Sequence, residues 1–121
     1  MARALGAEAK LQIAVADYCM WRSIPMLHIA NERKCSIGYG MQLKRMGVRA
    51  GVSDCFFLRP THYPCAWLEL KIGNNKPTAL QMEFIQEMRS YGHFADWVNS
   101  FDKAVAIIDN LHVGASFTPI V

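Results

Sequence analysis

Two short apolar segments that follow one another closely place the strongest constraint on the fold of this chain. Cys55 to Leu58 and Cys65 to Lys71 are rich in the aromatic and aliphatic side chains that strands favour. A turn at Pro60 to Pro64 joins them, so an antiparallel pair is the simplest arrangement. Asp54 stands at the mouth of the first strand. The chain is therefore expected to fold around a sheet that has a charged edge.

The segments around this hairpin alternate between helical and extended patterns. Residues 5–21 carry apolar side chains at helical spacing, and residues 78–90 carry an apolar stripe that is expected to face inward. The first set is Leu5, Ala9, Ile13, Ala16 and Met20, and the second is Leu80, Phe84, Ile85 and Met88. Further strands are predicted at 26–30 and 94–98, and further helices at 41–46 and 101–111. This order predicts a small α/β or α+β protein in which helices flank a mixed β-sheet.

Size and composition exclude several classes of protein. The 121 residues suit one domain, 1–121, with a core at about 5–110 and a tail at 111–121. A hydrophobic fraction of 52% with 19% charged residues argues against wholesale disorder. No apolar run is long enough to span a membrane, and no secretory signal precedes the first helix. We therefore expect a cytoplasmic protein that makes no contact with membranes.

Positive charge is concentrated in the middle of the chain. The net charge is +3, but Arg22 to Lys76 contains nine basic and only three acidic residues, a net of +6. Such a segment suits a surface that binds a polyanion, although an ordinary solvated face explains it equally well. The four cysteines are Cys19, Cys35, Cys55 and Cys65. They form no Cys-x-x-Cys pair, so reduced thiols are a better interpretation than zinc ligands or disulfides.

Asp54, Glu69 and Lys71 form the group with the clearest chemical meaning. Glu69 and Lys71 are two apart on a predicted strand, so they project from the same face. If the hairpin register places Asp54 opposite them, two carboxylates and an ammonium meet at one sheet edge. Carboxylate oxygens suit Mg²⁺ or Mn²⁺, which activate water and stabilise charge on a phosphodiester. An acid before a strand and a Glu-x-Lys pair are also common surface features, so these residues need support from the wider sequence.

A longer pattern of glycines, acids, a lysine and a glutamine supplies that support. It includes His28-Ile-Ala-Asn31-Glu32, then Leu43 to Asp54, Trp67 to Lys71, Thr78 to Gln81, and Tyr91-Gly92. Over residues 5–110 this pattern resembles the VRR-NUC family, the virus-type replication-repair nucleases of the PD-(D/E)XK superfamily. The resemblance implies a restriction-endonuclease-like core.

The resemblance also implies roles for individual residues. Asp54 and Glu69 match the metal-binding acids, with the backbone carbonyl of Leu70 as a further ligand, and Lys71 matches the catalytic lysine. Mg²⁺ or Mn²⁺ is the implied cofactor. Ser53 departs from the family pattern, in which proline usually precedes the acid.

Two further positions match the family but have competing structural explanations. Gln81 matches a glutamine beside the active site, yet it follows Thr78 at the spacing of a helix capping box. Glu8 matches an acid of the first helix that completes the metal site in many superfamily members. It also suits the first turn of a helix, where an acid is stabilised by the helix dipole.

The function implied is a metal-dependent DNA endonuclease that acts on branched DNA, such as Holliday junctions, in replication or repair. The resemblance also suggests a homodimer and a bacterial or phage-infected host cell. The residues expected to contact the DNA backbone, or else to form a solvated face, are Arg33, Lys34, Lys44, Arg45 and Arg49. Two other functions remain open: a DNA-junction binding module without cleavage, and an assembly subunit with a nuclease-like fold. RNA also remains open as the substrate.

Overall fold

The computed structural model describes residues 4–30 and 36–114 and contains eight helices and strands in this part of the chain. They are α1 (Ala7–Trp21), β1 (Met26–His28), α2 (Ile37–Arg45), β2 (Cys55–Phe57), β3 (Ala66–Leu70), α3 (Ala79–Ser90), β4 (Phe94–Val98) and α4 (Phe101–Leu111). The predicted order of elements is confirmed. Over these residues no helix is long and apolar enough to cross a membrane.

A mixed sheet of four strands lies at the centre of the molecule, in the order β1-β2-β3-β4. β1 with β2 and β2 with β3 pair antiparallel, whereas β3 and β4 pair parallel. The predicted hairpin is therefore confirmed, and its register places Cys55 opposite Leu68. The parallel pair needs a crossover connection, which α3 provides. The fold is α+β, as expected.

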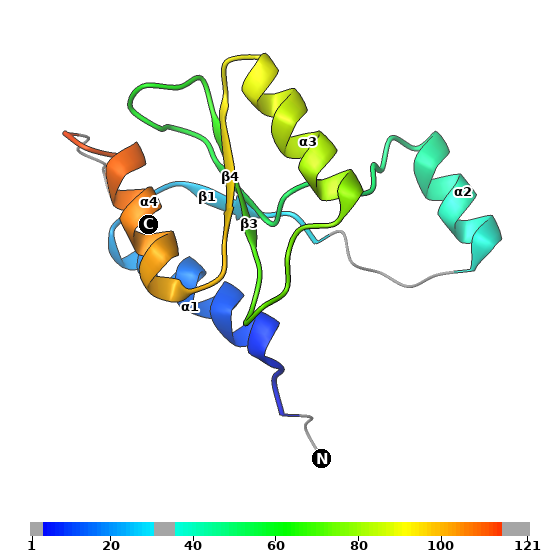
Figure 1. Ribbon diagram of the computed structural model, residues 1–121, viewed down its shortest axis with the longest axis horizontal. Helices are drawn as coiled ribbons and strands as arrows, with labels where there is room; N and C mark the ends of the chain where they lie inside the picture. Colours follow the sequence, from blue (N-terminus) through cyan, green and yellow to red (C-terminus); the bar gives the residue numbers. More distant parts are fainter. Residues whose placement is uncertain (1–3, 31–35, 115–121) are drawn as a thin grey trace.

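Helices cover both faces of this sheet (Figure 1). α1 and α4 pack on one face, where Leu68 and Leu70 of β3 meet Val15 and Ile108. α3 packs on the other face, where Phe84 makes an edge-on ring contact with Trp67 at 5.0 Å between centroids. Because successive strand residues point to opposite faces, Glu69 belongs to the α3 side with Trp67.

The buried face of α1 differs from the one that its apolar spacing indicates. Ile13 is 46% exposed and Met20 is 80% exposed, whereas Val15 and Cys19 are buried against the sheet. Polar residues lie on two opposite sides of α1, with Glu8 and Gln12 on one and Lys10 and Asp17 on the other. Periodicity therefore predicts a helix but does not select the side that packs. On α3 the inward stripe is confirmed for Phe84, Ile85 and Met88, but Leu80 is 54% exposed.

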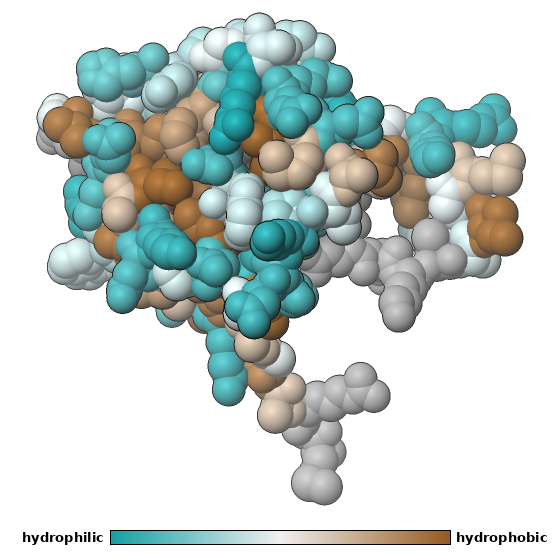
Figure 2. Space-filling model, in the orientation of Figure 1, coloured by the Kyte–Doolittle hydropathy of each residue, from teal (hydrophilic) through white to brown (hydrophobic). Residues whose placement is uncertain are grey.

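α2 begins earlier than expected and stands apart from the sheet (Figure 1). The helix starts at Ile37 rather than Met41, because the Ser36 hydroxyl accepts a hydrogen bond from the Tyr39 amide at 3.2 Å and caps it. Within the part of the chain that the structure describes, none of the α2 residues is buried. Figure 2 shows hydrophobic residues reaching the surface in this projecting region.

Gly51 generates a prediction about stability. Its φ is +87°, and an ideal Cβ at this position would lie 2.7 Å from the carbonyl oxygen of Leu80. Gly51→Ala should lower the free energy of unfolding by about 2 to 3 kcal/mol, because it adds a clash to an unfavourable backbone conformation. Urea denaturation measures this change.

Two other glycines provide matched controls. Gly47 also has a positive φ of +101° but open space around it, so Gly47→Ala should cost only about 1 kcal/mol. Gly38 lies in α2, and a Cβ added there would meet no other atom within 4 Å. Gly38→Ala should therefore be neutral or stabilising by up to about 1 kcal/mol. Equal effects at Gly51 and Gly47 would show that the contact with Leu80 is unimportant.

Candidate active site

Asp54 is held in place at the point where the chain enters β2. The amide of Leu70 donates a hydrogen bond to Asp54 Oδ2 at 2.9 Å, within the buried part of the hairpin. The carbonyl oxygen of Asp54 accepts from the Ile29 amide at 2.8 Å and lies 2.9 Å from His28 Nδ1. Asp54 is only 8% exposed. Its backbone and its carboxylate are thus tied to both neighbouring strands.

The loop before Asp54 packs against the first turn of α3. The positive φ of Gly51 allows the close approach to Leu80 described above. Ser53, at the position where the family pattern has proline, is 1% exposed, and its hydroxyl has no hydrogen-bond partner among the described residues. Ser53 therefore belongs to the buried part of this loop, directly before Asp54.

Glu69 lies next to Asp54 across the hairpin. The register pairs Cys55 with Leu68, and one further step places Asp54 opposite Glu69. Glu69 is 1% exposed. Both acids also raise the pKa of the Cys55 thiol. Burial is the main cause and brings this pKa to about 12, while the charges of Asp54 and Glu69 and the neighbouring Cys19 add to the increase. A hydrogen bond with Gln12 lowers the pKa in part. The predicted pairing of the two acids at one sheet edge therefore agrees with the backbone register.

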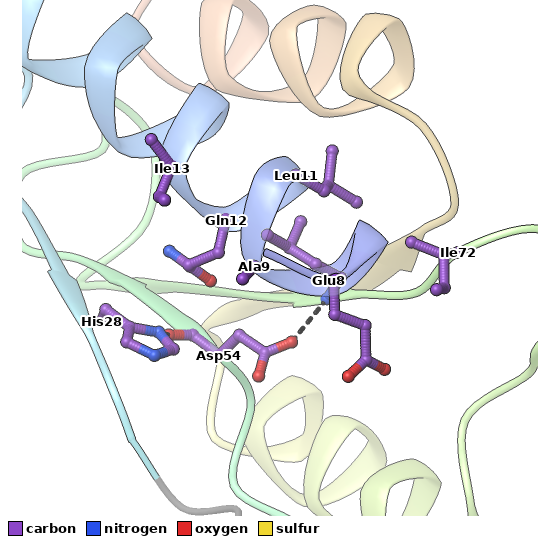
Figure 3. Close-up of a pocket in the computed structure, with 10 residues that line it drawn as sticks. Glu8, Ala9, Leu11, Gln12, Ile13, His28, Asp54 and Ile72 are labelled. Carbon is purple, nitrogen blue, oxygen red and sulfur yellow. Dashed lines mark hydrogen bonds between the residues drawn. The ribbon is translucent and has the colours of Figure 1, made fainter. Parts of the chain in front are cut away.

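A pocket of about 390 Å³ opens between α1 and this end of the sheet. Its lining includes Glu8 and Gln12 from α1, His28, Asp54 and Leu70. In Figure 3 the carboxyl groups of Glu8 and Asp54 point toward the same side of the pocket. Gln12 is also part of the lining, and its Nε2 atom lies 3.7 Å from the Cys55 sulfur. Glu8 of the first helix thus lines the same pocket as Asp54.

The predicted metal ligands are only partly assembled. Glu8, Asp54 and Leu70 share the pocket, whereas Glu69 and the half-buried Lys71 continue the α3 side of β3. Among residues 4–30 and 36–114, no three His, Cys, Asp or Glu side chains form a group that could hold a metal ion. Mg²⁺ nevertheless needs only one or two carboxylates and fills its remaining positions with water and phosphate oxygens. The oxygen donors of Glu8 and Asp54 fit such an ion.

Gln81 serves the helix rather than the pocket. Its side-chain oxygen accepts from the Thr78 amide at 2.9 Å, and its own amide donates to the Thr78 hydroxyl at 3.2 Å. This is the capping box that its spacing indicated. Gln81 does not belong to the pocket lining.

The predicted DNA-contacting residues divide into groups. Lys44 and Arg45 are exposed in the last turn of α2. Arg49 forms an ion pair with Glu87 at 2.8 Å, and its guanidinium lies 5.3 Å from the centre of the Phe84 ring. The hydrogen bond from Arg49 lowers the pKa of the Glu87 carboxyl. Arg33 and Lys34 lie outside the described residues. Arg49 thus links its loop to α3, while Lys44 and Arg45 are presented to solvent.

His28 is a polar residue of the pocket that was not predicted as part of the site. His28 appears in the sequence only as the first member of a family-like run, and no spacing rule selects it. It enters the pocket because it ends the edge strand β1 and lies opposite Cys55. A polar residue within the predicted strand at 26–30 is the signal that would have identified it.

Comparisons with known proteins find similarity to a solved structure. Neither a family model nor a curated protein matches the sequence. A solved structure described as a VRR_NUC domain protein superposes with a TM-score of 0.78 at 21% sequence identity, covering 98% of each chain. At this identity the similarity shows the fold, and that fold is the one that the sequence pattern implied.

The position of Arg49 leads to a second prediction. Arg49→Ala should lower the free energy of unfolding by about 1 kcal/mol, because it removes an exposed ion pair and a cation–π contact. Arg49→Lys should recover only part of this loss, since lysine has no planar fork to stack on Phe84. Lys44→Ala, which removes an exposed cation from α2, is the control and should leave stability unchanged. Equal unfolding midpoints for Arg49→Ala and Lys44→Ala would contradict the structural role of Arg49.

Proposed function

Because the chain shares its fold with a VRR_NUC domain protein, we propose that it is a nuclease that hydrolyses DNA phosphodiester bonds with Mg²⁺ or Mn²⁺. The observation that carries the proposal is the placement of Asp54. It is anchored by hydrogen bonds at the mouth of a pocket, beside Glu8 and opposite Glu69 in register. Burying an acid near two other acids lowers the stability of the fold. Such a cost is typical of a site whose function needs negative charge.

Each residue of the site has a chemical task in this proposal. Glu8 and Asp54 would hold the metal ion from the pocket that they share. Glu69 and the backbone carbonyl of Leu70 are the further ligands that the resemblance implies. When bound, the ion supplies an activated water and neutralises charge on the phosphate. The Lys71 ammonium, from the residue after β3, would orient that water and balance the charge that develops on the phosphate oxygens. Leu70 additionally keeps Asp54 in position through its amide.

The proposed substrate is branched DNA, such as a junction in replication or repair. Lys44 and Arg45 are exposed on a projecting helix, and the segment from Arg22 to Lys76 has a net charge of +6. Contacts from such side chains go mainly to phosphates and read the shape of DNA rather than its sequence. A domain of 121 residues has little area for base recognition, which favours a substrate defined by shape.

We also propose that the chain acts as a homodimer. α2 has nine residues, includes Gly38 and Gly40, and buries none of its side chains in the described part of the chain. Helices shorter than about 12 residues are marginal in water unless one face packs against something. Ile37 and Met41 are 85% and 63% exposed, which supports a second copy as the partner that covers this helix.

A DNA-junction binding module without cleavage is the second candidate. The observation that favours it is the lack, among the described residues, of three side chains grouped closely enough to hold a metal ion. Such a module would bind junctions equally well with or without Mg²⁺. Cleavage assays therefore separate the two functions.

Removal of the Asp54 charge tests the proposed nuclease. Asp54→Asn keeps the size of the side chain but removes the charge that a metal ion needs, so DNA cleavage should fall by about 100-fold or more. Linear, flap and four-way-junction DNA are incubated with the protein and Mg²⁺, Mn²⁺ or a chelator. RNA of the same length tests whether RNA is also cleaved. Binding of junction DNA in a chelator should stay unchanged.

Asp17→Asn is the matched control, because it removes an exposed carboxylate from the same helix that carries Glu8. Its cleavage should equal that of the unmodified protein. Unchanged cleavage by Asp54→Asn would refute the site, and no cleavage of any substrate by the unmodified protein would favour the binding module.

Sedimentation velocity tests the proposed dimer. Met41→Glu places a charge on the exposed apolar side of α2. It should raise the dissociation constant of the dimer by about tenfold or more. Gln42→Glu adds the same charge at the next residue, which is exposed but polar, and should leave the dimer intact. A monomeric unmodified protein would contradict the dimer, and a dimer that survives Met41→Glu would place the interface elsewhere.

A further inference from the structure

His28 contacts the backbone of the central acid from the opposite side of the pocket. It is the last residue of β1, and its register partner is Cys55, the residue after Asp54. Its Nδ1 atom lies 2.9 Å from the carbonyl oxygen of Asp54. The same oxygen accepts a hydrogen bond from the Ile29 amide at 2.8 Å. The histidine is thus a second donor to an atom that the strand ladder already binds.

This contact decides the tautomer of the imidazole. A carbonyl oxygen only accepts hydrogen bonds, so Nδ1 must carry the proton. In the neutral ring Nε2 is then an acceptor on the far side of the imidazole. His28 is itself part of the pocket lining, and in Figure 3 its ring lies beside Asp54, on the side away from Glu8.

The surroundings of Asp54 explain why an additional anchor matters. β1 and β2 are only three residues long, and the loop before Asp54 turns at glycines with positive φ. Few ladder hydrogen bonds therefore hold the backbone where the acid emerges. A side-chain donor from the neighbouring strand restrains the direction in which the Asp54 side chain leaves the backbone.

We propose that His28 is a positioning residue for Asp54: its Nδ1–H donates to the Asp54 carbonyl oxygen and keeps the carboxylate aimed into the pocket. The role in metal binding rests on the proposed function, whereas the hydrogen bond itself does not. Partners of this kind, which orient a ligand without binding the metal, typically contribute 10- to 100-fold in metal affinity or activity.

The hydrogen bond is tested without any metal or DNA. Long-range ¹H–¹⁵N correlation spectra of the unmodified protein at mildly alkaline pH distinguish the two neutral tautomers of each histidine. His28→Ala identifies the His28 signals by their disappearance. The Nδ1–H tautomer is expected, and the Nε2–H tautomer would overturn the proposal.

Conservative variants test the consequence for the site. Asn places an amide nitrogen where histidine has Nδ1, whereas Gln places it near the position of Nε2. Electron paramagnetic resonance titration with Mn²⁺ should therefore show affinity lowered about 10- to 100-fold in His28→Ala and His28→Gln, and restored to within about threefold in His28→Asn. His62→Ala, which removes an exposed histidine outside this pocket, is the control.

The possible outcomes separate the two proposals. Equal losses in His28→Asn and His28→Ala, or full affinity in His28→Ala, would overturn the positioning role. If the unmodified protein does not bind Mn²⁺, the metal-dependent nuclease fails, and the tautomer measurement alone decides whether His28 anchors Asp54.

Discussion

The hydrogen bond from the Leu70 amide to the Asp54 carboxylate is the interaction on which the rest of the site depends. A carboxylate that is 8% exposed would be costly to bury without a donor, and this bond supplies one from the neighbouring strand. It also fixes the relation between β2 and β3 at the end where both acids lie. The loop contact at Gly51 and the contact with His28 bring the same residue into position from two other sides.

Positive charge serves different purposes in different parts of the molecule. Arg49 is engaged with Glu87 and Phe84 and joins its loop to α3, so its place in a basic segment of sequence does not make it a phosphate ligand. Arg22 similarly links α1 to α4 through Asp109 at 2.7 Å. Lys44 and Arg45 remain exposed on a helix that projects from the sheet. A count of basic residues along the chain therefore overstates the surface available to a polyanion.

Much of the fold was predictable because its signals are local. Gly92 and the turn at Pro60 to Pro64 delimit elements whose observed bounds agree closely with the predicted ones. The start of α2 was missed because Gly38 and Gly40 disfavour a helix, while the Ser36 cap that stabilises it depends on one hydroxyl. The predicted buried face of α1 was wrong at Ile13 and Met20, because polar residues on two opposite sides of this helix leave no single apolar face to predict.

Local sequence patterns were sufficient for the order of helices and strands and for the hairpin, because short-range periodicity and the turn at Pro60 to Pro64 indicate both. They left open whether Asp54 lies opposite Glu69 and which side chains share the pocket, since the register of the hairpin and the packing of the layers set these contacts. Glu8 and His28 reach Asp54 because α1 packs on one face of the sheet and β1 pairs at its edge. Arg49 forms its ion pair with Glu87, a residue that is likewise far from it in the sequence. Such contacts join residues far apart in the chain, and their geometry follows from how layers pack rather than from any local pattern.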